Sequence, residues 1–414
     1  MNPVMNWVEN KMAKVDARKE LALMHPDEVE KARYFHMSFP QYQATPLVSL
    51  ESLARHFGLG RIYIKDESYR FGLNAFKVLG GSYAMARFIA KRTGRDIRTL
   101  DYKALTSPQV KRELGDYSFY TATDGNHGRG VAWAANQIGQ KCFVFMPKGS
   151  SRTRLANIRR EGATAEITKL NYDDAVRLAA EESAKNPNSA VIQDTAWDGY
   201  EEIPSWVMQG YGTMALEAQE QLRHVGVERP THIFVQAGVG SLAGAVHGYF
   251  ANLFPENPPV TIVVESDAAD CLYKSAQKGD GTLEKVGGEL STIMAGLACG
   301  EGNTISWRIL RDKVNFFVSL PDYAAARAMR VLAVPLKGDP PVISGESGAA
   351  GTGCLLEALM NPQHEDFKKA LNLNEKSRIL LFSTEGNTDP DWFRRVVWEG
   401  DYADPNISKS GNIK

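Results

Sequence analysis

Residues Leu73–Gly81 read Leu-Asn-Ala-Phe-Lys-Val-Leu-Gly-Gly, which places Lys77 between apolar side chains and ahead of a glycine pair. Most lysines keep their ammonium group in water. An apolar setting favours the uncharged amine, which is a nucleophile toward carbonyl carbon. A strand-like run, Arg61–Lys65, precedes the segment, and a helix reaching about Arg92 is expected after it. The sequence therefore predicts a strand–turn–helix unit that presents a reactive lysine.

The order of strand, turn and helix recurs along the chain. Apolar and β-branched runs with the length of strands are Arg61–Lys65, Cys142–Pro147, His232–Gln236, Thr261–Glu265 and Arg378–Phe382. Amphipathic segments separate these runs, which predicts an α/β fold with mostly parallel sheets flanked by helices. A chain of 414 residues is long for a single core, so we expect two lobes.

Composition and charge exclude several classes of function. With 43% hydrophobic and 23% charged residues, the chain is typical of soluble globular proteins. A net charge of −1 without a long basic run gives no electrostatic support for binding nucleic acid or a membrane surface. Neither a signal peptide nor an apolar run of about 18 residues is evident, so we expect a cytoplasmic enzyme.

The four cysteines carry little information about function. Cys142, Cys271, Cys299 and Cys354 form no C-x-x-C pair, which argues against a zinc site and a thioredoxin-like motif, and we expect no metal. Reduced, buried thiols are the expectation for a cytoplasmic chain. Whether Cys271 and Cys299 pair stays open, because the sequence does not give their separation.

Two glycine-containing turns, Thr121–Gly128 and Gln236–Gly244, each follow a strand-like run and are expected to open helices. Glycine amides and a helix N-terminus together favour a bound anion. The second turn is not a nucleoside triphosphate loop. It also departs from the dinucleotide fingerprint, because the third glycine falls on Ala243, although that position tolerates alanine. A tight turn without a ligand is the alternative.

The first turn adds side chains that can choose a ligand. Asn126 offers a donor and an acceptor to a phenolic oxygen. Asp124 repels an anion, so its target is a cation or a proton, unless it only caps the helix. A reactive lysine, an asparagine turn and a glycine loop match the aldehyde, phenol and phosphate of pyridoxal 5'-phosphate, which we expect as cofactor with a small amino acid as substrate.

Nearly the whole chain, from about Tyr34 to Trp398, carries runs of a known family. These runs are Asn74–Lys77, Thr123–Gly130, Gln193–Trp197, Met208–Tyr211, Ile293–Glu301, Ser344–Ala349 and Ser383–Asp389. They resemble the fold-type II pyridoxal phosphate enzymes, the group of tryptophan synthase β and threonine dehydratase, and within it the diaminopropionate ammonia-lyases. Dehydratases usually have Ser-x-Gly-Asn where this chain has Thr-Asp-Gly-Asn, so Asp124 marks the ammonia-lyases.

The resemblance implies a two-lobed, tryptophan synthase β-like fold with the cofactor between the lobes. It implies a large cofactor-binding domain formed by residues 40–94 plus 197–400 and a small domain formed by residues 95–196. Residues 1–39 form an N-terminal arm that we expect to be helical, and residues 401–414 form a polar tail. A homodimer is the expectation of the family.

Carried onto this sequence residue by residue, the resemblance assigns roles to most of these runs. Lys77 would form the Schiff base with the cofactor, and Asp194 would be a second catalytic carboxylate beside Asp124. Thr384 would face the pyridine nitrogen, with Ser383 as the alternative in the next register. The residues that would hold the cofactor are Lys77, Asn126, Gly238, Val239, Gly240, Ser241, Leu242, Glu346 and Thr384. The residues that would bind the substrate carboxylate are Thr123, Asp124, Gly125, Asn126 and His127.

The activity implied by the resemblance is α,β-elimination of ammonia from 2,3-diaminopropionate, which gives pyruvate and two ammonia from both D and L isomers. Two acids suit this substrate, because Asp124 and Asp194 can bind its β-ammonium group and can accept a proton. Our hypothesis is that Lys77 takes the α-proton of the L isomer and that Asp124, on the opposite face, takes that of the D isomer.

Three alternatives remain from the residues. A serine or threonine dehydratase is disfavoured by Asp124, because a small neutral residue is expected there when hydroxide leaves. A dinucleotide-binding oxidoreductase using Gly238–Gly244 lacks an evident acidic ribose partner, since Glu256 is the only near candidate, and leaves Lys77 unexplained. A silent binding module on the same fold is disfavoured by the intact Lys77.

Overall fold

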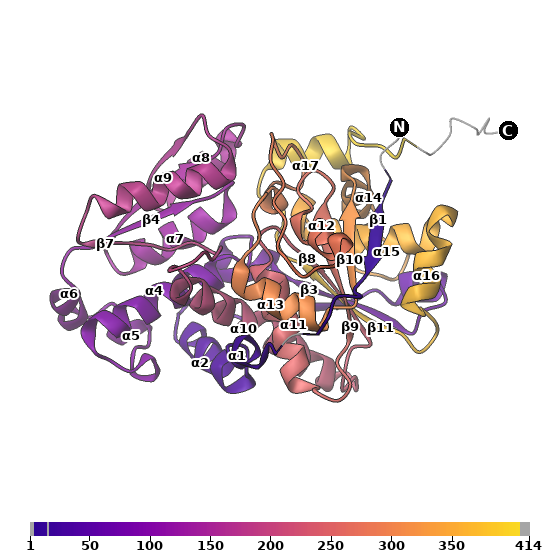
Figure 1. The fold of residues 1–414 in the computed structure, drawn as a ribbon, viewed down its shortest axis with the longest axis horizontal. Helices are drawn as coiled ribbons and strands as arrows, with labels where there is room; N and C mark the ends of the chain where they lie inside the picture. The colour runs from indigo at the N-terminus through magenta and orange to yellow at the C-terminus, as the bar shows by residue number, and fades with distance from the viewer. Residues whose placement is uncertain (1–3, 15, 406–414) are drawn as a thin grey trace.

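The computed structural model describes residues 4–14 and 16–405 and contains two β-sheets (Figure 1). The seven-stranded sheet has the order β1-β10-β9-β8-β11-β3-β2, and the four-stranded sheet has the order β6-β5-β4-β7. The larger sheet consists of β1 (Asn6–Glu9), β2 (Leu47–Ser49), β3 (Arg61–Asp66), β8 (His232–Gln236), β9 (Val260–Ser266), β10 (Phe316–Leu320) and β11 (Arg378–Ser383). The smaller sheet consists of β4 (Ser118–Ala122), β5 (Lys141–Met146), β6 (Thr164–Ile167) and β7 (Ser189–Val191).

Most strand pairs are parallel, as the sequence predicts. All pairs of the smaller sheet are parallel, and in the larger sheet only the outer strands β1 and β2 run antiparallel to their neighbours β10 and β3. The five predicted strands correspond to β3, β5, β8, β9 and β11. The predicted fold class, an α/β fold with mostly parallel sheets flanked by helices, is confirmed.

Helices cover both sheets. Around the larger sheet lie α1 (Arg18–Ala22), α2 (Pro26–Met37), α3 (Glu51–His56), α4 (Val78–Thr93), α10 (Glu202–His224), α11 (Ser241–Leu253), α12 (Cys271–Lys278), α13 (Thr304–Lys313), α14 (Asp322–Ala333), α15 (Glu346–Met360), α16 (Glu365–Leu371) and α17 (Pro390–Val397). The smaller sheet is accompanied by α5 (Tyr102–Leu105), α6 (Pro108–Leu114), α7 (Asn126–Gln137), α8 (Arg152–Arg160) and α9 (Tyr172–Ala184). Short 3-10 turns are η1 (Glu67–Gly72), η2 (Ile97–Thr99), η3 (Ala295–Leu297) and η4 (Pro362–His364). We call these two assemblies the larger and the smaller lobe.

The alternation of side chains along each strand explains why the larger sheet needs helices on both faces. In β11, Leu380 and Phe382 enter the apolar core shared with α10 and α11, whereas Ile379 and Leu381 enter the core beneath α14 and α15. All of these side chains are fully or almost fully buried. A strand that is apolar on both faces is typical of a parallel sheet covered on both sides.

The N-terminal arm corrects one expectation. Instead of being helical throughout, it begins as β1, which pairs antiparallel with β10 and places Trp7 opposite Val318. The Trp7 ring lies 5.0 Å from the Phe367 ring and 6.0 Å from the Phe316 ring, measured between centroids. This aromatic packing holds the arm as an edge strand before α1 and α2 follow. The predicted polar tail from residue 406 onward lies outside the described residues.

Close packing of α4 against α10 fixes the start of α4, where Lys77 lies. A Cβ atom on Gly80 would approach a Tyr211 ring carbon to 2.5 Å, and one on Gly210 would approach the Leu79 carbonyl oxygen to 2.3 Å. Because either contact would force the helices apart, Gly80 and Gly210 allow the close packing of α4 against α10. The Lys77 segment is also tied to β11, since the Phe76 amide donates to the Thr384 carbonyl at 3.0 Å.

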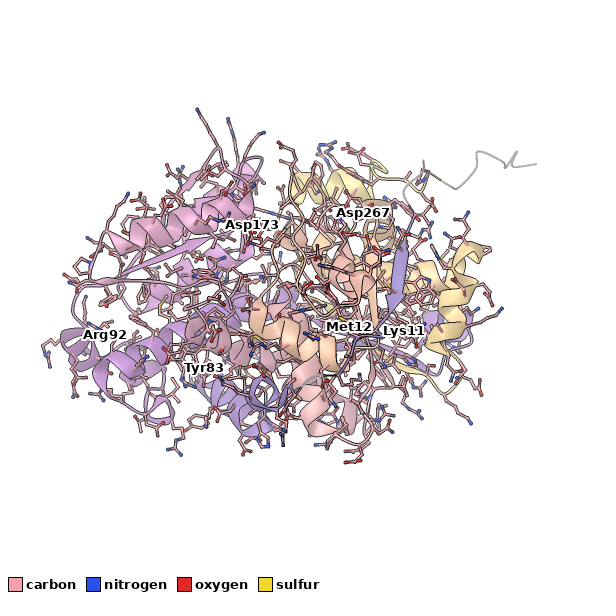
Figure 2. All side chains as sticks on the ribbon, in the orientation of Figure 1. Lys11, Met12, Tyr83, Arg92, Asp173 and Asp267 are labelled. Atoms are coloured by element: carbon pink, nitrogen blue, oxygen red, sulfur yellow. The ribbon has the colours of Figure 1, made fainter. Side chains whose placement is uncertain are left out.

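The two lobes meet where α9 faces the segment after η3. The Asp173 carboxylate accepts a hydrogen bond from the backbone of Gly300, and Arg177 forms an ion pair with Glu301. Figure 2 shows Asp173 at this junction. Burial raises the pKa of Asp173 to about 6.

Among the described helices, none is long and apolar enough to cross a lipid bilayer.

Candidate active site

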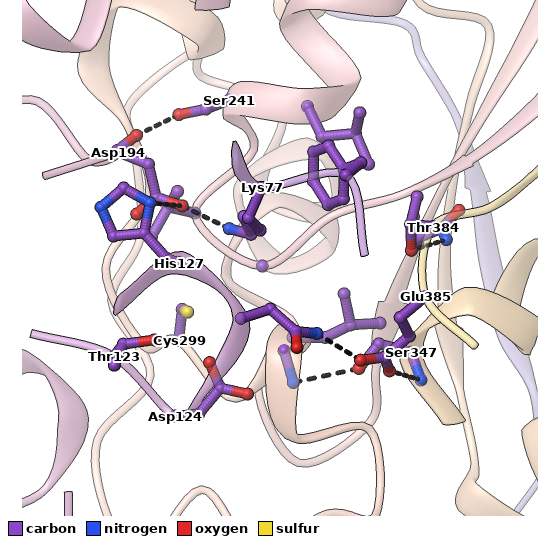
Figure 3. A pocket seen from close by; sticks show the side chains of 18 of the residues that line it. Lys77, Thr123, Asp124, His127, Asp194, Ser241, Cys299, Ser347, Thr384 and Glu385 are labelled. Carbon is purple, nitrogen blue, oxygen red and sulfur yellow. Dashed lines mark hydrogen bonds and ion pairs between the residues drawn. The ribbon is translucent and has the colours of Figure 1, made fainter. Parts of the chain in front are cut away.

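One cavity lies between the lobes, where the loops after β4, β7, β8 and β11 converge on the start of α4 (Figure 3). The carboxyl ends of parallel strands are the usual position of a ligand in open α/β sheets. The predicted residues that line the cavity are Lys77, Thr123, Asp124, Asn126, His127, Asp194, Gly238, Val239, Gly240, Ser241, Leu242 and Thr384. Segments that are more than 300 residues apart in the sequence are thus brought to one place.

Lys77 forms an ion pair with Asp194, whose side chain is 1% exposed (Figure 3). Burial by itself favours the neutral amine, but the Asp194 carboxylate raises the pKa of Lys77 above its ordinary value. Burial likewise opposes ionisation of Asp194, yet the Lys77 ammonium lowers the pKa of that carboxyl. The expectation of an uncharged Lys77 is therefore wrong for this structure, because the sequence did not show which side chain faces the amine.

Hydrogen bonds from three elements hold Asp194 in place. The Tyr172 hydroxyl donates to Oδ1 at 3.3 Å, and the Tyr211 hydroxyl donates to Oδ2 at 3.4 Å. The Ser241 hydroxyl donates to the Asp194 carbonyl, which joins the residue to the first turn of α11. Asp194 is thus anchored from α9, α10 and α11, and its carboxylate cannot turn away from Lys77 without breaking these contacts.

His127 lies beside the same carboxylate. Its Nε2 atom donates to the Ile192 carbonyl at 2.8 Å, which leaves Nδ1 as the acceptor nitrogen of the neutral ring. Nδ1 lies 4.0 Å from Asp194 Oδ2 and has no hydrogen-bond partner within the part of the chain that the structure describes. Burial lowers the pKa of His127. The imidazole therefore ties the 123–127 loop to the end of β7 as a neutral group.

The glycine loop between β8 and α11 provides backbone donors rather than side chains. Gly240 has φ +96°, a left-handed conformation that favours glycine, and a Cβ atom on Gly238 would approach the Gly296 carbonyl oxygen to 2.9 Å. No side-chain cap is formed at the start of α11 within the described residues, so its first amides keep free donors. Such a loop fits a phosphate group.

Contacts at the far end of the cavity distinguish Thr384 from Ser383, the two candidates to face the pyridine nitrogen. The Thr384 hydroxyl lines the cavity and accepts a hydrogen bond from Gln236 Nε2 at 2.8 Å. The Ser383 hydroxyl is bonded instead to the Ser344 hydroxyl at 2.9 Å and does not line the cavity. The geometry therefore favours Thr384 as the residue that faces a bound ring.

Glu346, which the resemblance assigns to the residues that hold the cofactor, is not among the residues that line the cavity. Its carboxylate lies 3.5 Å from Arg154 and does not line the cavity, whereas Glu385 does. Glu385 accepts hydrogen bonds from the Asn126 side-chain amide and, at 3.0 Å, from the Ser347 backbone amide. Glu346 is the first residue of α15, and its carboxylate points toward Arg154 of the smaller lobe. Glu385 lines the cavity instead of Glu346.

Several residues of the site are missing from the sequence prediction. Tyr172 and Glu385 line the cavity, and Arg154 lies 3.5 Å from Asp124 Oδ2. Of these, Glu385 lies inside a family run, next to Thr384, and could have been proposed from it. Tyr172 and Arg154 lie in polar helices of the smaller lobe, where a tyrosine or arginine is ordinary.

The cysteines follow the simpler expectation. All four are free thiols and are buried. Cys299 lines the cavity, and Cys271 contacts Glu265, with its sulfur 3.7 Å from Oε1. The question left open by the sequence is thus answered for this structure, in which Cys271 and Cys299 are not bonded to each other.

The fold and the cavity define an α/β enzyme of the pyridoxal phosphate type, and comparison with known proteins agrees. A family model described as pyridoxal-phosphate dependent enzyme matches residues 39–384, and the chain belongs to that family. The chain is 52% identical over 381 residues to the diaminopropionate ammonia-lyase of Salmonella typhimurium, which covers 92% of this chain and 94% of that protein. This level of identity places the chain in the diaminopropionate ammonia-lyase branch of the family.

Solved structures support the same placement. The Escherichia coli diaminopropionate ammonia-lyase in complex with D-serine matches with a TM-score of 0.89 and 44% identity, covering 97% of this chain and 99% of that chain. The same enzyme in complex with an aminoacrylate-PLP azomethine reaction intermediate matches with a TM-score of 0.87 and 45% identity, covering 97% and 98%. The predicted cofactor, pyridoxal 5'-phosphate, is confirmed, and the dinucleotide-binding alternative is not favoured.

Proposed function

We propose that this protein removes ammonia from 2,3-diaminopropionate, giving pyruvate and two ammonia with the uptake of one water. The observation that carries the proposal is the placement of Lys77, Asp124 and Asp194 around one cavity beside a glycine loop. Two carboxylates suit a substrate with two ammonium groups. The relatives named above carry the same activity in their names.

The proposed binding of the cofactor uses both lobes. Backbone amides of the loop Gly238–Leu242 hold the phosphate, the Asn126 amide contacts the ring hydroxyl, and the Thr384 hydroxyl faces the ring nitrogen. Lys77 attaches the cofactor covalently. When bound, the cofactor supplies an electron sink for the bond broken at the substrate Cα. Glu346, predicted as a further contact, is replaced in this proposal by Glu385.

Asp194 contacts the Lys77 amine in both proposed roles of that amine, which are attachment of the cofactor and removal of the α-proton. Because its pKa is raised, Lys77 must lose a proton before it can react with a carbonyl group, and Asp194 is the carboxylate that holds the ammonium form until then. Once free of the cofactor, the Lys77 amine takes the α-proton of the L isomer. Asp194 then stabilises the ammonium that forms and also lies within reach of the β-ammonium group of the substrate.

Asp124 serves the other face in this proposal. Figure 3 shows its carboxylate across the cavity from the Lys77–Asp194 pair. From that side it takes the α-proton of the D isomer, whose hydrogen points away from Lys77. The substrate carboxylate is held by the 123–127 loop, where α7 begins at Asn126 without a side-chain cap among the described residues.

Product stoichiometry tests the proposal. Purified protein with cofactor is incubated with D- and L-2,3-diaminopropionate and with L-serine and L-threonine, and ammonia and 2-oxo acid are measured. We expect two ammonia per pyruvate from both diaminopropionate isomers and slower turnover of the hydroxy amino acids. Preferred turnover of serine or threonine, with one ammonia per 2-oxo acid, would instead make the protein a dehydratase.

The finer features of the assembly are also proposals. All strands of the smaller sheet fall within residues 118–191, which supports residues 95–196 as the small domain. Free, buried cysteines accord with a reducing compartment such as the cytoplasm. From the family we propose a homodimer, which light scattering of the purified protein would test.

A further inference from the structure

Arg154 is a buried cation at the edge of the cavity. It belongs to α8 of the smaller lobe, and its side chain is 7% exposed. One guanidinium nitrogen lies 3.5 Å from Asp124 Oδ2, and the other lies 3.5 Å from Glu346 Oε2 on the larger lobe. A single arginine therefore bridges the Asp124 turn and the start of α15.

The turn is shaped to receive this arginine. A Cβ atom on Gly125 would lie 2.9 Å from Cδ of Arg154, so the aliphatic part of the arginine packs directly on the backbone between Asp124 and Asn126. The Nε atom of Arg154 is buried and has no hydrogen-bond partner among the described residues. The side chain thus supports the turn by packing, and its charge is not fully satisfied by hydrogen bonds.

The surroundings of Arg154 are strongly acidic. Burial disfavours its charge, but the carboxylates around it raise its pKa. The carboxylates that act on it are those of Glu385, Glu346, Asp124 and Asp389. Within this group, Arg154 is the cation in contact with Asp124. Without it, the Asp124 carboxylate would face the other acids with no cation in contact.

We propose that Arg154 is a positioning residue for Asp124, which holds this carboxylate in place and aimed into the cavity. The inference rests on the proposed function and deepens it by identifying the group that makes the second base usable. Because Lys77 is anchored independently by Asp194, loss of Arg154 affects the D isomer far more than the L isomer. Arg154 thereby determines which isomers the enzyme accepts.

Other groups near Asp124 do not replace Arg154. The groups that interact electrostatically with Asp124 from the remaining elements are Tyr172 on α9, Cys299 after η3 and His127 on α7. Tyr172 and Cys299 carry no positive charge in either protonation state, and burial lowers the pKa of His127, which favours its neutral ring. The nearby ammonium of Lys77 is engaged by Asp194.

Kinetics of an Arg154→Gln variant with each isomer test the proposal. We expect kcat/KM for the D isomer to fall on the order of 30-fold or more, and that for the L isomer to fall by no more than about threefold. The loss for the D isomer falls on kcat, because a displaced Asp124 transfers the proton poorly, while KM for the D isomer changes by no more than about threefold. Arg152→Gln, an exposed arginine on the same helix, is the matched control and should leave both isomers unchanged.

Two further variants separate positioning from simple destabilisation. The double variant Arg154→Gln/Glu346→Gln removes the buried carboxylate left without its partner, so a purely structural defect would be relieved, whereas the loss with the D isomer should persist. In Arg154→Ala, added guanidinium ion should restore turnover of the D isomer, because a cleft of about 670 Å³ that Arg154 lines also opens on Asp124.

The outcomes distinguish the inference from the proposed function. Equal losses for both isomers, or full recovery in the double variant, would overturn the role of Arg154. If the unmodified protein turns over neither isomer, the proposed function itself fails, and no variant is needed to show it. Loss of turnover of the D isomer alone, carried by KM rather than kcat and without guanidinium rescue, would also overturn the inference.

Discussion

The two ends of the cavity present different chemical groups, backbone amides at one end and charged side chains at the other. The glycine end, Gly238–Leu242, offers backbone amides in a turn fixed by close contacts with Gly296 and by the left-handed Gly240. The charged end, Lys77, Asp124 and Asp194 with Arg154 behind them, depends on side chains from both lobes. The first end lies within a single strand–turn–helix unit, whereas the second exists only once the lobes are assembled.

This difference separates holding the cofactor from choosing the reaction. A phosphate site made of amides is the same in any enzyme with this turn, so it says little about substrate. The charged end carries the groups that can move protons at the substrate Cα and bind its β-ammonium group. Substitutions at the two ends should therefore fail in different ways, in binding of the cofactor at one end and in turnover at the other.

The largest effect is expected for Lys77→Ala at the charged end. Loss of the amine removes both the covalent link and the base for the L isomer, so turnover should fall by on the order of 10³-fold or more. Pyruvate formation from each isomer measures it. Lys91→Ala, on the exposed side of the same helix, is the control and should keep full activity. Residual turnover near the normal rate in Lys77→Ala would remove Lys77 from the mechanism.

Asp124→Asn should have the next largest effect and should separate the role of Asp124 from that of Lys77 at the charged end. Asparagine keeps the shape but cannot accept a proton, so turnover of the D isomer should fall by about 10² or more, and the L isomer should be affected much less. Steady-state kinetics with each pure isomer measure the ratio. Equal losses for both isomers, with the cofactor still bound, would contradict the assignment of opposite faces.

Gly240→Ala tests the glycine end. A Cβ atom there would approach the Ser306 hydroxyl oxygen to 2.9 Å at φ +96°, so the loop must shift, and affinity for the cofactor should fall about tenfold. Turnover at saturating cofactor should be nearly retained. Gly226→Ala is the matched control, because it has φ +76° but no atom within 4 Å of the added Cβ. Weakened turnover with unchanged affinity would mean that the two ends are not separable.

The last effect is expected in folding stability and leaves turnover and cofactor binding aside. Burial raises the pKa of Glu346 from 4.5 to about 7, so the folded protein binds the proton more tightly than the unfolded chain between these values. Stability therefore falls as pH rises from about 4.5 to 7, by up to roughly 3 kcal/mol. Glu346→Gln should flatten this slope in urea unfolding followed from pH 5 to 8. An identical slope in the variant would show that Glu346 does not titrate in this range.

Much of the glycine end and of the fold could be predicted from the sequence, because both depend on residue patterns within short segments. The apolar runs of β3, β5, β8, β9 and β11 and the turn at Gly238–Leu242 need no knowledge of distant residues. The start of α4 at Val78 and of α7 at Asn126 also follow from local signals. The edge strand β1 was missed, because its pairing depends on β10, which lies about 300 residues away.

The charged end could be predicted only in part. Lys77 and Asp124 stand out in the sequence itself, and Asp194 is identified through the family resemblance. The charge of Lys77 could not be predicted, since it depends on the contact with Asp194. Arg154 is one of several arginines in α8. Only the folded structure shows that Arg154 is the buried one and that it contacts Asp124. Glu385 rather than Glu346 lines the cavity, and the sequence alone does not show that the Glu346 carboxylate lies against Arg154.

The most direct test of the central claim is the absorption spectrum of the purified protein with pyridoxal phosphate, before and after addition of each diaminopropionate isomer. We expect a band at roughly 410–420 nm that is absent in Lys77→Ala and that changes on addition of either isomer while pyruvate accumulates. A band that ignores diaminopropionate but responds to serine would contradict the substrate assignment. The same band in Lys77→Ala would contradict the account of the charged end.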